Sequence, residues 1–191
     1  MPVRPSLVLL SKYAGQFPRK KRSEESCLDL RRGVRRFEED GSVFRILFVC
    51  HGNICRSPMC EFVMKELVRR AGRDAEFVID SKACRTDEIG SDAHPGTQRM
   101  LRAKGIPFSR RAARLIRRED YDAYDFVIAM DDENMRDLHR LTKGDPERKC
   151  RLLLSFAGEE REVADPWYTG NFEATYQDAM KGCKALLAQF E

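Results

Sequence analysis

Short apolar runs recur along most of this chain. The run from Arg45 to Val49 is rich in strand-forming residues and stops at Cys50 and Gly52, which is typical of a buried parallel strand. The same reasoning predicts three more strands, at Phe77 to Ile79, Phe126 to Met130 and Arg151 to Leu154.

Between these runs, apolar residues recur at helical spacing. Strands that alternate with helices indicate an α/β fold in which helices cover both faces of a parallel sheet. The predicted helices run from Pro58 to Gly72, from Pro95 to Lys104 with Gly105 as cap, through Asn134, Leu138 and Leu141, and from Phe172 to Phe190.

The composition narrows the class of protein. The chain has 191 residues, of which 42% are hydrophobic and 35% charged, as expected for one globular domain that needs no covalent cross-links. No apolar run approaches the ~20 residues of a membrane helix, so no membrane span is expected. The seven cysteines are odd in number and form no C-x-x-C pair, so neither a disulfide framework nor a zinc ribbon is expected. With no export signal predicted, we interpret them as reduced thiols of a cytoplasmic protein.

The positive charge is concentrated near the N-terminus. Residues 1–44 hold 10 Lys and Arg against 6 Asp and Glu, whereas residues 45–191 hold 25 of each. Basic clusters such as Arg19 to Arg22 can bind nucleic acid or anionic lipid, but a solvated, flexible extension explains them as well. We therefore interpret residues 1–44 as a flexible basic extension and expect no nucleic-acid partner.

Candidate chemistry gathers where the first predicted strand ends, in the segment Cys50 to Pro58. Ligands of parallel sheets bind beyond the carboxyl ends of the strands. A loop that leads from a strand into a helix N-terminus directs backbone N–H groups at one point and favours an anion. The guanidinium of Arg56 suits a phosphate, and a thiolate of Cys50 beneath that phosphate would be a nucleophile.

The rest of this segment strengthens the interpretation. A cysteine that ends a buried strand is often an inert core residue, and C-x-x-x-x-x-R alone is a short motif. Gly52 and Asn53 suit a tight loop, because Asn53 tolerates a positive φ. Ser57 can cap the helix that Pro58 opens, donate a hydrogen bond to the thiolate, or do both.

Phosphoryl transfer also needs an acid for the departing oxygen. Asp165 is a candidate, since it precedes Pro166 and the aromatic pair Trp167 and Tyr168, which suits a flat substrate ring. From the residues alone, an Asp-Pro turn beside a core tryptophan is an equally good explanation.

The loop Cys50 to Pro58, Asp80-Ser81, Met130-Asp131, Asn134 and the segment Asp165 to Tyr168 resemble the low-molecular-weight protein tyrosine phosphatases. The resemblance covers residues 45–191 and implies a single domain with a four-stranded parallel sheet of order 2-1-3-4. It also implies a monomeric enzyme that hydrolyses phosphotyrosine in proteins, and small aryl phosphates, through a cysteinyl-phosphate intermediate, without a metal or cofactor.

The resemblance further implies roles for individual residues. Cys50 would be the nucleophile, Arg56 would bind phosphate, and Asp165 would act first as acid and then as base. Cys55 would form a reversible disulfide with Cys50 under peroxide. The loop would be supported by His51, Gly52, Asn53, Ile54, Cys55, Ser57, Ser81 and Asp131, and the substrate pocket would include Glu88, Trp167 and Tyr168.

Some positions depart from the family pattern. His51 replaces a small or aliphatic residue, Glu88 falls where many members place an aromatic residue, and Arg111 stands near a common histidine. An acidic Glu88 leaves the peptide preference open, because it would favour basic substrates.

Three other functions fit parts of the pattern. A thiol-dependent arsenate reductase would need a cysteine pair near the third strand, and the chain has none between Met130 and Leu141. Protein-arginine phosphatases share the loop but favour threonine at the position of Ile54. A phosphotyrosine-binding module without activity would not require Cys50, Arg56 and Asp165 together.

Overall fold

The computed structural model describes residues 43–190, and the basic extension predicted for residues 1–44 lies almost wholly outside them. A four-stranded parallel sheet of order β2-β1-β3-β4 forms the centre of the domain, which confirms the predicted order. Its strands are β1 (Phe44–Cys50), β2 (Phe77–Ala83), β3 (Phe126–Ala129) and β4 (Cys150–Leu152).

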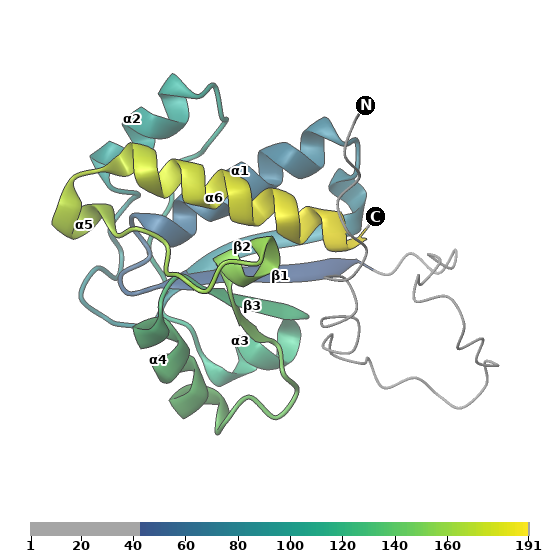
Figure 1. Cartoon of the computed structure of the whole chain (residues 1–191). Helices are drawn as coiled ribbons and strands as arrows, with labels where there is room; N and C mark the ends of the chain where they lie inside the picture. Colours follow the sequence, from purple (N-terminus) through teal and green to yellow (C-terminus); the bar gives the residue numbers. More distant parts are fainter. Residues whose placement is uncertain (1–42, 191) are drawn as a thin grey trace.

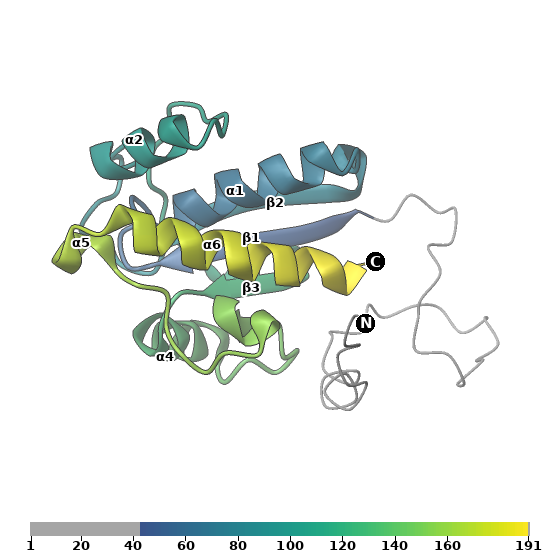
Figure 2. The same cartoon turned by 45° about the horizontal axis from the view of Figure 1, so that its top comes forward.

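Helices cover both faces of the sheet (Figures 1 and 2). Alternate residues of β1 divide between the two faces, because successive side chains of a strand point to opposite sides. Ile46 and Phe48 belong to a core with α1 (Arg56–Arg70) and α6 (Phe172–Leu187). Leu47 and Val49 belong to a core with α3 (Arg118–Ala123) and α4 (Asp132–Thr142).

An aromatic cluster closes the sheet at the amino ends of the strands. The ring of Phe190 lies 4.5 Å from that of Phe44 and 5.2 Å from that of Phe77, measured between centroids. Phe126 completes the cluster at 5.4 Å from Phe190. The last residues of the described chain thus bury apolar surface at the end of the sheet opposite the candidate loop.

The predicted elements all exist, but several bounds were wrong. Helix α1 begins at Arg56, two residues before Pro58, and β2 extends to Ala83 because it pairs with the whole of β1. The predicted fourth strand ends at Leu152, and its last residues form the 3₁₀ helix η3 (Leu153–Ala157). Gly182 allows α6 to pack on η3, since a Cβ there would lie 2.4 Å from Leu153.

Short elements without a long apolar period escaped prediction. They are α3, α5 (Pro166–Thr169) and η2 (Asp74–Glu76), whereas η4 (Ala188–Phe190) lies within the predicted terminal helix, whose α-helical part ends at Leu187. Helix α2 (Pro95–Ala103) lies on the α1 side and was predicted to within one residue. In the part of the chain that the structure describes, no helix is both long and apolar enough to cross a membrane.

Candidate active site

The loop after β1 lies at the carboxyl end of the sheet, beside the start of α1 and close to α5 (Figure 1). Cys50 is the last residue of β1 and is 3% exposed. Its Sγ lies 3.0 Å from the Oγ of Ser57 in the first turn of α1. The N-cap of α1 is Cys55, so of the two roles considered for Ser57 the helix cap is contradicted, whereas the contact with the Cys50 sulfur is present.

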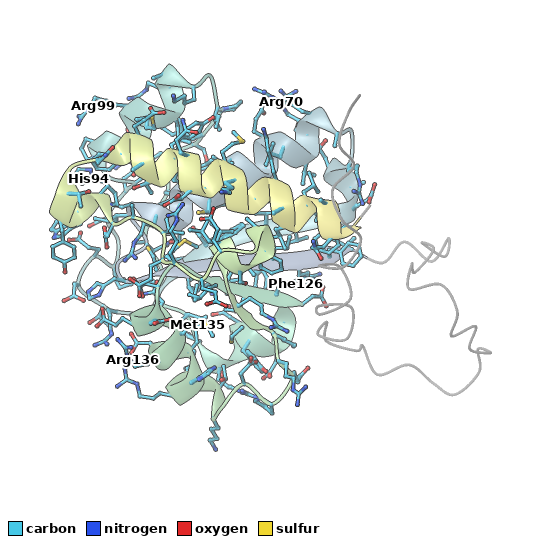
Figure 3. The ribbon with its side chains drawn as sticks, viewed as in Figure 1. Arg70, His94, Arg99, Phe126, Met135 and Arg136 are labelled. Atoms are coloured by element: carbon cyan, nitrogen blue, oxygen red, sulfur yellow. The ribbon has the colours of Figure 1, made fainter. Side chains whose placement is uncertain are left out.

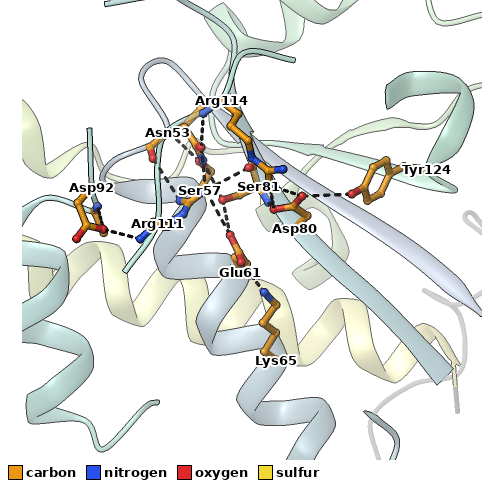
Figure 4. A network of polar contacts seen from close by, with 12 residues as sticks. Asn53, Ser57, Glu61, Lys65, Asp80, Ser81, Asp92, Arg111, Arg114 and Tyr124 are labelled. Carbon is orange, nitrogen blue, oxygen red and sulfur yellow. Dashed lines mark hydrogen bonds and ion pairs between the residues drawn. The ribbon is translucent and has the colours of Figure 1, made fainter. Parts of the chain in front are cut away.

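Asn53 organises this loop from within (Figure 4). Its φ of 59° places it in the expected left-handed region, and its side chain is fully buried. Its Nδ2 donates to the Oγ atoms of Ser57, at 2.9 Å, and Ser81, at 2.8 Å. The two serines, from α1 and β2, are thereby held by one amide.

The directions of these hydrogen bonds follow from the carboxylate at their far end. Ser81 Oγ donates to Glu61 Oε2 at 2.6 Å, because an ionised carboxylate can only accept. Ser57 Oγ accepts from Asn53, so its single hydroxyl proton is free to point at the sulfur of Cys50. The arrangement supplies a donor to a thiolate at Cys50.

Arg111 supports the network from outside the loop, as Figure 4 shows. Its guanidinium donates to Asn53 Oδ1 at 2.8 Å and to the backbone oxygens of Asn53 and Ser81 at 3.3 and 3.2 Å. It also lies 3.6 Å from Glu61. These contacts fix which end of the Asn53 amide faces the serines.

Sequence reasoning noted Arg111 only as a departure from a pattern and missed Glu61. A signal for Glu61 exists in the chain, because it follows Ser57 by four residues and so shares its face of α1. The two side chains are linked through Ser81 and Asn53, which lie outside α1.

Two carboxylates converge on Arg56, which is 4% exposed. Its Nη1 donates to Asp131, and its Nη2 lies 2.6 Å from Asp165 Oδ2. Burial opposes the charge of Arg56, but Cys50 and the two carboxylates outweigh that effect and raise its pKa. Asp131 is itself fixed as the N-cap of α4, since its Oδ1 accepts from the backbone N of Asn134 at 2.6 Å.

Asp165 is the N-cap of the short helix α5, and its Oδ1 accepts from the backbone N of Trp167 at 2.9 Å. Its Oδ1 therefore caps α5, while its Oδ2 faces Arg56 at the loop. Trp167 is 58% exposed and Tyr168 84%, so the alternative of a core tryptophan was wrong. Both aromatic residues are available to a ligand at the mouth of the site.

The opposite rim is formed by the segment after β2. The backbone N of Arg85 donates to His51 O at 2.9 Å, and His51 Nε2 lies 3.2 Å from Asp87 Oδ2. Glu88 packs over the loop, since a Cβ on Gly52 would lie 2.9 Å from its Cγ. Glycine at position 52 therefore lets this segment close over the loop.

Two further thiols lie close to Cys50. Cys55 is buried in the same loop, and burial, together with the charges of Cys50 and Asp165, raises its pKa to about 12. Cys84 donates its backbone N–H to Cys50 O at 2.9 Å, and burial raises the pKa of its thiol as well. Within residues 43–190 no three His, Cys, Asp or Glu side chains are placed to share a metal ion.

Known proteins resemble the chain over this same region. The family model described as low molecular weight phosphotyrosine protein phosphatase matches residues 45–191. A low molecular weight protein-tyrosine-phosphatase of Bacillus subtilis, YfkJ, is 38% identical over 148 residues, which are 76% of this chain and 95% of that protein. A low molecular weight phosphotyrosine protein phosphatase of Sus scrofa is 37% identical over 74% of this chain and 92% of its own.

Solved structures agree with these relatives. The crystal structure of YfkJ has a TM-score of 0.76 at 39% identity, and the match covers 78% of this chain and 96% of that one. The crystal structure of a Drosophila arginine phosphatase has a TM-score of 0.69 at 28% identity, with 76% and 97% covered.

Proposed function

The chain belongs to the low molecular weight phosphotyrosine protein phosphatase family, and we propose that it hydrolyses phosphotyrosine through a cysteinyl-phosphate intermediate on Cys50. The position of Arg56 is the main support for assigning the catalytic roles to these residues. The guanidinium of Arg56 is held at the loop by Asp131 while its other amino group meets Asp165. A nucleophile, an oxyanion partner and an acid thus surround one point.

In the first step, the Cys50 thiolate attacks phosphorus, and the bond from phosphorus to the tyrosine oxygen breaks. Arg56 holds two phosphate oxygens and stabilises the charge of the transition state. Asp165 gives its proton to the departing phenolate oxygen. Because the phosphate and Asp165 share the Nη2 of Arg56, a bound phosphate releases the carboxyl of Asp165 to carry that proton.

In the second step, water attacks phosphorus and the sulfur–phosphorus bond breaks. Asp165, now ionised, accepts a proton from the water, and Cys50 leaves as a thiolate. The hydroxyl of Ser57 stabilises that thiolate through the 3.0 Å contact with its sulfur. Inorganic phosphate is released and the site returns to its starting protonation.

The mouth of the site favours an aromatic substrate. The exposed rings of Trp167 and Tyr168 offer flat surfaces for the phenyl group of phosphotyrosine. A protein-arginine phosphatase is the second candidate, because an arginine phosphatase shares the fold at 28% identity. Ile54, in the position where those enzymes favour threonine, weighs against phosphoarginine. We further expect a monomer that works in the cytoplasm, where its thiols stay reduced.

One assay tests these assignments together. Phosphate release from a phosphotyrosine peptide and from phosphoarginine is compared with arsenate-dependent thiol consumption, each with the wild type and with Cys50→Ser. We expect release from phosphotyrosine by the wild type alone, because a serine hydroxyl stays protonated at neutral pH. Faster release from phosphoarginine would contradict the substrate assignment, and turnover by Cys50→Ser would contradict the nucleophile.

A further inference from the structure

His94 lies where α2, α5 and the start of α6 meet (Figures 1 and 3). Its ring stacks on that of Phe172, with centroids 5.1 Å apart and planes 8° from parallel. The ring of Trp167 meets it edge to face at 6.0 Å and 75°. One imidazole thus joins the first residue of α6 to the exposed tryptophan of α5.

The ring is held in place from the side of the loop. His94 is the N-cap of α2, and its Nδ1 accepts from the backbone N of Gly96 at 3.1 Å. Its backbone N donates to Ile54 O at 2.8 Å, inside the loop that follows Cys50. A Cβ on Gly96 would lie 2.3 Å from the ring of Phe172, so glycine at 96 is what allows the stack to form.

The segment that carries Asp165 is anchored unevenly. Before Asp165, the backbone N of Val163 donates to Met130 O at 2.9 Å, and Ala164 O accepts from Thr175 at 2.8 Å. After it, residues 167–171 are all exposed. Pro166, the first residue of α5, is buried, and beyond it the ring of Trp167 contacts that of His94.

This contact bears directly on the carboxyl group of Asp165. Its Oδ1 is oriented by the backbone N of Trp167, and its Oδ2 faces Arg56. A shift of α5 would move Asp165 with it, because Asp165 is the N-cap of that helix, and would change the position of Oδ2 relative to Arg56. In that position the carboxyl would be misplaced for a leaving group.

We propose that His94 is a positioning residue that, through Trp167, holds Asp165 in place to protonate the leaving group. The inference rests on the proposed function, because it assigns His94 a part in the step that Asp165 performs. Neither the loop motif nor the acid segment contains His94. It acts on the chemistry only through the packing of its ring.

A matched pair of variants separates the two contacts of the side chain. His94→Asn keeps an acceptor for the Gly96 N–H but loses the ring, whereas His94→Phe keeps a ring to pack on Phe172 and Trp167 but loses the acceptor. For each variant, kcat is measured on phenyl phosphate, whose leaving group needs a proton, and on para-nitrophenyl phosphate, whose leaving group needs little help. Thermal unfolding is recorded alongside.

We expect His94→Asn to lower kcat on phenyl phosphate about tenfold more than on para-nitrophenyl phosphate, because small displacements of a catalytic group are costly. His94→Phe keeps the wild-type ratio of the two rates. In an Asp165→Ala background, His94→Asn leaves the ratio unchanged. Equal losses on both substrates, or a change of ratio that persists without Asp165, would overturn the proposal.

The same data distinguish this proposal from the proposed function. If Asp165→Ala alone leaves the substrate ratio at its wild-type value, Asp165 is not the acid and both assignments fall. If Asp165→Ala changes the ratio while His94→Asn does not, the proposed function stands and the role of His94 is rejected.

Discussion

At the scale of single residues, the guanidinium of Arg56 is shared between two carboxylates, those of Asp131 and Asp165. Its Nη1 is committed to Asp131, which α4 holds in place, while its Nη2 faces Asp165 at 2.6 Å. In the proposed mechanism, a substrate phosphate takes the same Nη2. Its binding would free Asp165 from Arg56, so that the carboxyl could carry the proton for the leaving group.

Asp165→Ala tests the acid directly. We expect the rate on a phosphotyrosine peptide to fall by about 10²–10⁴-fold, and the rate on para-nitrophenyl phosphate to fall much less, because nitrophenolate leaves without a proton. Steady-state kcat on both substrates measures the difference. Some loss with both is expected, since Asp165 also serves as base in the second step. Equal losses would direct the search for the acid to Asp131.

A second prediction at this scale concerns Cys55. Peroxide oxidises the Cys50 thiolate to a sulfenic acid, and attack by Cys55 then forms a disulfide and releases water. The raised pKa of Cys55, about 12, keeps it a thiol at neutral pH, so the disulfide should form faster toward alkaline pH. Cys55→Ser should make peroxide inactivation irreversible.

Cys84→Ser is the matched control, because Cys84 also borders Cys50 through its backbone. Activity is measured after peroxide treatment and again after dithiothreitol. We expect thiol reductant to restore the wild type and Cys84→Ser but not Cys55→Ser. Full recovery of Cys55→Ser would show that Cys55 is not the resolving residue.

At the scale of elements, hydrogen bonds from α1, β2 and the segment of Arg111 hold the loop in place. Glu61 comes from α1, Ser81 from β2, and Asn53 from the loop itself. Arg111 and Lys65 both lie beside the buried carboxylate of Glu61, and Arg111 also donates to both oxygens of Asn53. No single element contains enough of these groups to define the loop alone.

Arg111→Leu should cost about 2 kcal/mol in the free energy of unfolding, because it removes the closest donor to the buried Asn53 Oδ1 and one of the two cations beside Glu61, of which Lys65 remains. It should also slow alkylation of Cys50 by iodoacetate at neutral pH, since Ser57 loses its fixed orientation. Arg114→Leu is the control, because Arg114 is 55% exposed and pairs with Asp80 at the surface. We expect it to cost under about 1 kcal/mol. Similar costs for the two variants, measured by urea unfolding, would contradict a buried structural role for Arg111.

At the scale of the whole molecule, buried thiols make the fold sensitive to alkali. Burial raises the pKa of Cys55 from 9.0 to about 12, and burial and Asp145 raise that of Cys150 further. A thiol whose pKa is higher in the folded than in the unfolded protein contributes its full stabilisation below pH 9, the unfolded pKa. That contribution is lost as the pH rises toward the pKa of the folded protein. The free energy of unfolding should fall above pH 9, by about 1.4 kcal/mol per pH unit for each such thiol.

Urea unfolding between pH 7 and 11 measures this dependence. Cys150→Val is the comparison, because Cys150 lies in β4 and has no part in the proposed chemistry. Its loss of stability with pH should be shallower than that of the wild type. Identical slopes would mean that Cys150 does not ionise on unfolding in this range.

A last prediction concerns the basic extension. Every proposed catalytic residue follows Arg45, and residues 45–191 carry no net formal charge. A chain that begins at Ser42 should fold and hydrolyse para-nitrophenyl phosphate at the full-length rate. The test compares the activity and the melting temperature of the full-length chain with those of the shortened chain, at equal concentration. A large drop in either would mean that the extension contributes to the domain.

The sequence by itself determined the strands, the main helices and the place of the loop that carries the proposed nucleophile. Apolar runs and helical periods are patterns of neighbouring residues, so they can be identified in the sequence itself. The order of the strands in the sheet was predicted from the family resemblance. Cys50, Asn53 and Arg56 were found because they lie within seven residues of one another. For Asp165 the sequence left two explanations open, a general acid and a residue of an Asp-Pro turn, because the neighbouring residues fit both.

Only the tertiary structure decided how distant residues meet. Glu61, Arg111 and His94 contact partners up to 78 positions away in the chain, and spacing along the chain does not specify which residues those partners are. Trp167 is exposed on the short helix α5. Ser57 does not cap α1, because the helix already begins at Arg56, and the Ser57 hydroxyl contacts Asn53 and Cys50 instead. Side-chain polar groups are satisfied in three dimensions, so their partners are fixed by packing rather than by order along the chain.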